Sequence, residues 1–178
     1  WKRSRDAIKP ALSDIAVGAE DASSGSIAQC INAMLEKEGI NISVSALIAG
    51  GETPKNILSN TMKDARILDL TGCSVEEVLY YVSCGNPVFA MTGSNEAVLV
   101  VGYDANNVII FDSSSGNNFK QSITEADEVF KGAGNVFFTY RKESKCRKRQ
   151  VLQIHFQYKY MKKRENCIKK QCFHRIVR

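Results

Sequence analysis

The chain has 178 residues, the usual size of one domain, and its apolar fraction of 44% is enough for a single hydrophobic core. No run approaches the about 18 consecutive apolar residues of a membrane-spanning helix, which excludes such a helix from this sequence. The net charge of +5 is unevenly distributed: residues 1–142 hold 12 Lys and Arg against 17 Asp and Glu, whereas residues 143–178 hold 12 against 2.

This shift in charge predicts a domain boundary near Lys142. Three parts are expected: a weakly ordered lead-in from an upstream region at 1–19, a folded body at 20–142, and a basic tail at 143–178. The sequence begins at Trp1 without an initiator Met or an apolar signal segment, so we expect it to be a piece of a longer protein.

The first half of the body has helical periodicity. Ser26 followed by Gln29 is a capping-box pattern, and Ser74 followed by Glu77 is another. Thr53 before Pro54 is typical of a helix start. These signals predict helices within 26–39, 43–51, 53–65 and 74–87, with a short strand within 65–72.

After residue 86 the pattern changes to short β-rich runs separated by Gly, Asn, Asp and Ser. Strands are predicted within 87–93, 96–104, 107–112, 118–124 and 135–141, with a short helix capped by Thr124 between the last two. Helices followed by an antiparallel meander indicate an α+β fold, with the N-terminal helices packed on a C-terminal sheet.

Three segments, in this order, resemble the bacteriocin-processing cysteine peptidases, a papain-like family often fused to ABC exporters. They are "SIAQCINAMLEKEGI", "GNPVFAM" followed by "EAVLVVGYD", and "NVIIFDSSSG". The resemblance covers roughly residues 20–142. This part of the chain is similar to domains found in multidomain clostridial proteins. It implies a papain-like fold within a bacterial protein associated with the membrane or the cell envelope.

Matched residue by residue, the resemblance places Ser26 where the family has its nucleophilic cysteine. Glu96 takes the position of the histidine, Asp112 that of the aspartate, and Glu20 loosely that of the oxyanion-stabilising glutamine. Cys30 falls one helical turn after Ser26, where such helices carry a second, buried cysteine. Only the aspartate of the triad is retained.

A carboxylate cannot replace the histidine, because it cannot form the ion pair with the thiolate that activates a catalytic cysteine. Its negative charge would instead raise the pKa of the thiol. Residues 1–142 contain no histidine. In the matched geometry Glu96 would lie close to Asp112, and their repulsion would raise the pKa of one of them. Each residue also has a simpler interpretation: Ser26 as a helix cap, Cys30 as core, Glu96 as a solvated strand start and Asp112 as a turn cap.

The leading hypothesis is therefore a catalytically inactive peptidase-like domain that binds a peptide segment, in cis or from another protein. The alternative is a residual cysteine or serine peptidase. A glycosidase-like pair of Glu96 and Asp112 has little support at this spacing. No cofactor, metal or nucleic acid is expected for the body.

The tail has several open interpretations. Its Lys and Arg residues could bind anionic surfaces, either nucleic acid or membrane. Its Cys and His residues fit no standard zinc spacing well. It also has the composition expected of an AT-rich gene read out of frame, and a disordered or non-native tail is the favoured hypothesis.

Overall fold

The structure, a computed structural model, describes residues 8–12, 15 and 25–142. Glu20 and the whole basic tail, with its histidines and three of the six cysteines, lie outside the described residues. Among the described residues, no helix is long and apolar enough to cross a membrane.

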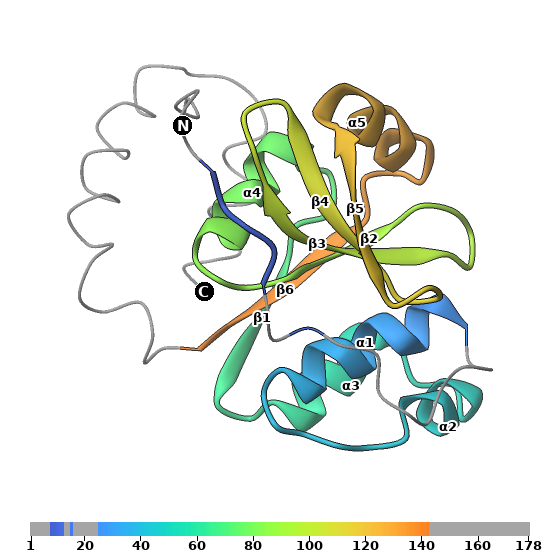
Figure 1. Cartoon of the computed structure of the whole chain (residues 1–178). Helices are drawn as coiled ribbons and strands as arrows, with labels where there is room; N and C mark the ends of the chain where they lie inside the picture. Colours follow the sequence, from blue (N-terminus) through green and yellow to red (C-terminus); the bar gives the residue numbers. More distant parts are fainter. Residues whose placement is uncertain (1–7, 13–14, 16–24, 143–178) are drawn as a thin grey trace.

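Within the described residues, six antiparallel strands form one sheet, and five helices cover its two faces (Figure 1). In chain order the elements are α1 (Ser26–Glu36), α2 (Val44–Ala49), α3 (Pro54–Thr61), β1 (Ala65–Asp69), α4 (Val75–Ser83), β2 (Val88–Met91), β3 (Ala97–Tyr103), β4 (Asn107–Asp112), β5 (Asn117–Ser122), α5 (Ile123–Gly132) and β6 (Phe137–Lys142). The predicted α+β class and the predicted elements are confirmed.

The strand order is β1-β6-β2-β3-β4-β5. Strands β2 to β5 form the predicted meander, but β6 does not continue it beyond β5. Instead, the chain returns through α5, and β6 lies between β1 and β2, at the end of the sheet away from β5. The position of β6 depends on pairing between residues far apart in the sequence, which local patterns do not encode.

The sheet separates two hydrophobic cores. One core packs α1, α2 and α3 against the face that includes Leu99, Phe111 and Tyr140. The other packs α4 and α5 against the opposite face, which includes Val100 and Ile110. The helices therefore cover both faces of the sheet, with the N-terminal helices α1, α2 and α3 packed on it as predicted.

The starts of α3 and α5 follow local capping chemistry, with one correction. The Thr53 hydroxyl accepts a hydrogen bond from the Asn56 N–H at 3.3 Å, with Pro54 in the first turn, as predicted. The cap of α5 is Ser122 and not Thr124: Ser122 and Glu125 form a reciprocal capping box two residues earlier than predicted. The β5 strand ends at the residue that caps the helix.

Part of the expected lead-in is bonded to the sheet, where a thin blue segment runs beside β3 (Figure 1). Lys9 and Tyr103 exchange two backbone hydrogen bonds of 2.8 Å, and the Leu12 N–H donates to the Val101 carbonyl at 3.2 Å. The register between β3 and β4 shifts between Val100 and Gly102, so this is a bulged stretch of β3. Strand β2 pairs with β3 only as far as Val100, so the lead-in pairs with the part of β3 that β2 does not reach.

Gly102 permits this close approach. A Cβ at position 102 would lie 2.7 Å from the Lys9 carbonyl oxygen and 3.0 Å from the Ala11 nitrogen. Both atoms belong to backbone, so the segment would have to move to make room. Any side chain at Gly102 therefore competes with the lead-in for the same space.

We predict that Gly102→Ala lowers the free energy of unfolding by about 1–3 kcal/mol, the usual cost of overpacking. Hydrogen exchange of the Tyr103 N–H should accelerate, because its bond to Lys9 is broken. Gly132→Ala is the matched control, since nothing lies within 4 Å of a Cβ there. Slow exchange at Tyr103 in Gly102→Ala would show that the lead-in is not held by this contact.

Candidate functional site

The first turn of α1 lies against the start of β3. The Ser26 hydroxyl oxygen accepts a hydrogen bond from the Ala97 N–H at 3.0 Å and lies 3.5 Å from the Asn95 carbonyl. The predicted Ser26 cap is wrong: the N-cap is Gly25, without a side-chain cap, and α1 begins at Ser26 itself. The hydroxyl joins the helix to the β2–β3 hairpin because it bonds β3 and not its own helix.

Cys30, one turn further along α1, is fully buried, as the core interpretation predicted. Its sulfur donates toward the Ala97 carbonyl at 3.4 Å and the Ser113 hydroxyl at 3.5 Å. Burial, opposed by the hydrogen bond to Ser113 and helped by the negative charge of Asp112, raises the pKa of Cys30 to about 12. Because the thiolate is the nucleophile, this thiol is inert at neutral pH.

Ser113 is a site residue that the sequence analysis did not identify. It is 1% exposed, and its hydroxyl donates to the Ser26 carbonyl at 3.3 Å. It therefore connects the turn after β4 to the first turn of α1 and also contacts Cys30. Its position directly after Asp112 was the available signal, but serine in such a run is also an ordinary turn residue.

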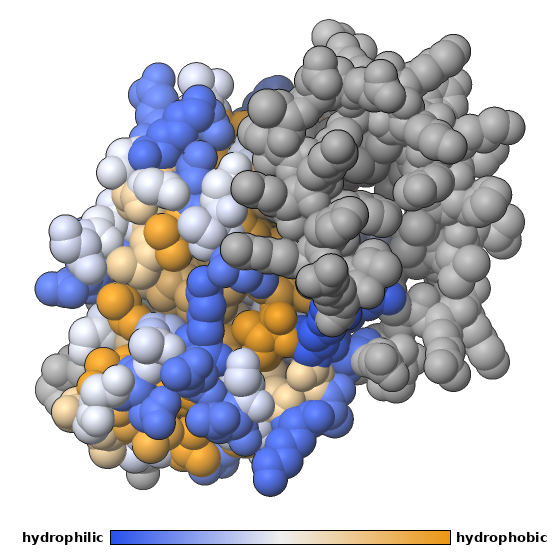
Figure 2. Space-filling view, turned by 180° about the vertical axis from the view of Figure 1, so that it is seen from behind, coloured by the Kyte–Doolittle hydropathy of each residue, from blue (hydrophilic) through white to orange (hydrophobic). Residues whose placement is uncertain are grey.

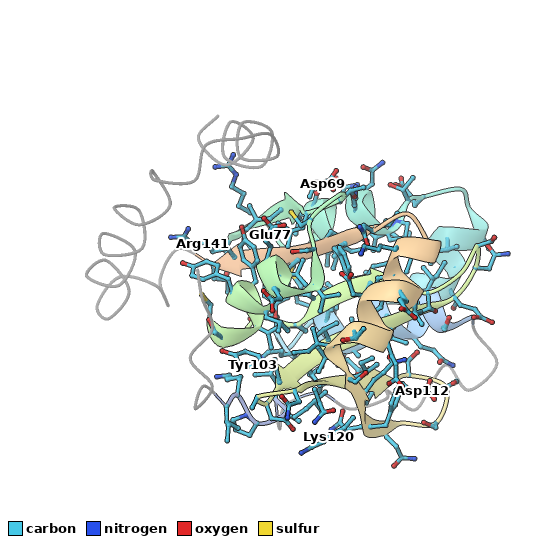
Figure 3. The ribbon with its side chains drawn as sticks, turned by 90° about the horizontal axis from the view of Figure 1, so that it is seen from above. Asp69, Glu77, Tyr103, Asp112, Lys120 and Arg141 are labelled. Carbon is cyan, nitrogen blue, oxygen red and sulfur yellow. The ribbon has the colours of Figure 1, made fainter. Side chains whose placement is uncertain are left out.

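Asp112 is held within its own turn, at the end of β4 (Figure 3). Its carboxylate accepts hydrogen bonds from the Ser114 hydroxyl at 2.5 Å, the Ser114 N–H at 3.0 Å and the Ser115 hydroxyl at 2.9 Å. The Ser114 hydroxyl, with the other serine donors, holds the pKa of Asp112 below its usual value, although partial burial opposes this. The geometry fits the turn-cap interpretation.

Glu96 is the last residue of the loop 92–96 between β2 and β3, and it is exposed. Its carbonyl accepts from the Thr92 N–H at 2.9 Å, and its carboxylate lies 3.5 Å from the position of a Cβ on Gly93. The expected repulsion between Glu96 and Asp112 would raise a pKa. At Asp112 the pKa is lowered instead, and serine donors account for it.

The structure nevertheless brings the three matched segments to one place. Ser26 contacts residues 95 and 97, on both sides of Glu96, and its carbonyl bonds the residue after Asp112. The junction brings together a hydroxyl already bonded to backbone, a buried thiol and the chain positions next to the acidic residues Glu96 and Asp112. We call this junction of α1, the β2–β3 loop and the β4–β5 turn the α1 junction.

The α1 junction holds no histidine within the described residues, because both histidines of the sequence, His155 and His174, lie in the tail. In the described part of the chain, no group of three or more His, Cys, Asp or Glu residues could hold a metal ion. The arrangement can accept hydrogen bonds from cationic or neutral donors, which carboxylates do well.

No protein-family model matches the sequence. No curated protein matches it significantly. Among solved structures, the fold is similar to that of a Bacillus anthracis protein assigned as a C39-like peptidase. The TM-score is 0.66 and the identity 16%, and the alignment covers 78% of this chain and 100% of that chain.

These features define a class by fold. The chain has the papain-like α+β fold of C39-like peptidases, as the resemblance implied. At this identity the likeness shows the fold alone.

Proposed function

We propose that this chain is a catalytically inactive, peptidase-like domain that binds a peptide segment at the α1 junction. The observation that carries the proposal is the chemistry at Glu96, where a carboxylate stands in the position that the resemblance gives to the catalytic base. The burial of Cys30 supports the proposed inactivity, because a thiol with a pKa of about 12 does not attack a peptide bond at neutral pH.

The charges of the α1 junction indicate which peptides would bind. Glu96 and Asp112 are both acidic, and residues 1–142 carry more acidic than basic side chains. Basic or neutral segments would therefore be preferred over acidic ones, through attraction that salt weakens. The segment would belong to the same larger protein or to a partner, in a bacterial envelope or transporter-associated setting.

The test is a peptide array probed with the full chain, followed by affinity measurements on selected peptides. Glu96→Lys should weaken the binding of basic peptides about 3- to 10-fold, the effect of reversing one exposed charge. Glu52→Lys reverses an equally exposed charge on the loop between α2 and α3 and should leave binding unchanged. Selection of acidic peptides only, or equal losses in both variants, would contradict the proposal.

A hydrolysis assay on the same peptides separates binding from catalysis. We expect no cleavage by the full chain. Cleavage that disappears in Ser26→Ala or Cys30→Ala would establish the alternative, a residual serine or cysteine peptidase, while leaving the peptide preference intact.

A further inference from the structure

The strand β5 forms an open edge of the sheet. It is last in the strand order and pairs with β4 alone, and its residues 117–120 are exposed. In Figure 1 no labelled element lies along its outer side. An exposed edge of six residues offers unpaired backbone groups to another strand.

The register identifies which backbone groups point outward. The Ile123 N–H donates to the Asn106 carbonyl at 3.0 Å, so these two residues form a hydrogen-bonded pair. Antiparallel pairs alternate between bonded and non-bonded. In the register of β4 and β5, Asn117, Phe119 and Gln121 therefore bond inward, while Asn118, Lys120 and Ser122 direct their N–H and C=O groups outward.

The side chains of this edge suit an apolar contact. Phe119 is 45% exposed and lies opposite Ile110, which is buried in the core under α5, so Phe119 is on the α5 side of the sheet. Val129 of α5 is also exposed, at 38%. The charge of the strand, on Lys120, is bound to Asp104 of the same chain at 3.0 Å and lies at the outer rim (Figure 3).

We propose that β5 pairs with β5 of a second copy of this chain, antiparallel, about a twofold axis through Phe119. In this register Asn118 faces Lys120 of the second copy, and both residues direct their backbone groups outward. Symmetry repeats the pair, which gives four hydrogen bonds. Phe119 then faces its own symmetry mate as a non-bonded pair, where side chains approach most closely and aromatic pairs add stability.

Neighbouring registers are weaker for reasons within the chain. An axis at Lys120 would place two like charges opposite each other and would require the Ser122 N–H, which already donates to Glu125 at 3.3 Å. An axis at Asn118 would require the Gly116 N–H, which already donates to the Asp112 carbonyl at 2.9 Å. The register centred on Phe119 is self-complementary, as a twofold interface must be.

Apolar side chains also gather on the face shown in Figure 2, but nothing in the described part of the chain indicates what would cover them. The β5 edge is formed entirely by described residues. The proposal is independent of the peptide-binding function.

The test is sedimentation velocity of the full chain from about 1 to 300 µM, a range suited to a small interface. We expect a monomer–dimer equilibrium that Phe119→Asp weakens at least tenfold. Leu47→Asp changes an exposed apolar residue on α2 and should have no effect. Both residues are exposed, and circular dichroism verifies that each variant folds.

The register is tested by cross-linking. Phe119→Cys should form a disulfide-linked dimer with oxidised glutathione, which is reduced as the two thiols are oxidised, because non-bonded antiparallel pairs hold their Cα atoms about 4.5 Å apart. The half-buried Cys84 and the tail cysteines Cys146, Cys167 and Cys172 are first replaced by serine, and Leu47→Cys is the control. A monomer at every concentration, or a dimer insensitive to Phe119→Asp, would overturn the proposal.

Discussion

Replacing Lys142 with methionine should lower the free energy of unfolding by about 3 kcal/mol, because it leaves a buried carboxylate without its cation. The Glu38 side chain is 6% exposed and accepts hydrogen bonds from the Lys142 ammonium at 2.6 Å and the Tyr140 hydroxyl at 2.6 Å. The Glu38 carboxylate also raises the pKa of both partners above their ordinary values, although burial has the largest effect on Tyr140. These bonds hold the end of β6 to the loop that follows α1.

Chemical denaturation of matched variants measures this effect. Lys131→Met removes the cation of an exposed ion pair with Asp127 and should cost less than about 1 kcal/mol. Combining Glu38→Gln with Lys142→Met should recover part of the loss, because no unpaired charge then remains buried. Equal effects of Lys142→Met and Lys131→Met would show that Glu38 is solvated and not buried.

Replacing Ser26 with cysteine should create a thiol that reacts with iodoacetamide at pH 7.5 about 10³ times faster than Cys30. The pKa of Cys30 is about 12, whereas an ordinary cysteine has a pKa of about 8.5, and each unit is a tenfold change in thiolate. At position 26 the thiolate would accept a hydrogen bond from the Ala97 N–H. It would also lie at the positive end of the α1 dipole, which stabilises a negative charge. Mass spectrometry of the modified peptides measures both rates in one sample.

Adding Glu96→His to this variant tests the residue matching. A histidine beside the new thiol should lower its pKa and raise its alkylation rate at pH 6 about tenfold over Ser26→Cys alone. Glu52→His, on the loop between α2 and α3 and outside the three matched segments, should leave the rate unchanged. If both double variants react equally, Glu96 does not occupy the position of the base, and the argument for a degenerate site fails.

Local chemistry in the sequence predicts much of this fold. Helical spacing and caps such as Thr53 with Pro54 predict the helices, and alternating β-rich runs predict the strands. The cap of α5 is missed by a choice between two neighbouring residues, Ser122 and Thr124, whereas at α1 a distant residue competes for a local group. Ser26 looks like a cap in isolation, but the Ala97 N–H binds its hydroxyl.

In the candidate site, too, local features are predictable from the sequence and long-range contacts are not. The resemblance identifies Ser26, Glu96 and Asp112, and their segments do meet. The pattern does not reveal that Ser113 connects them, because its partners are 83 and 87 positions away in the chain. The partners of Asp112 are the serines directly after it, so the lowered pKa at Asp112 could have been read from the sequence.

The attachment of residues 8–12 to β3 has a mechanical consequence. Tension applied to the chain before Ile8 would be borne first by the hydrogen bonds that join Lys9 to Tyr103 and Leu12 to Val101. While these bonds hold, the force passes into the middle of the sheet and does not reach the start of α1. Residues 8–12 would therefore carry the tension themselves, and Ser26 with the hairpin beside it would bear no force when the preceding chain is pulled.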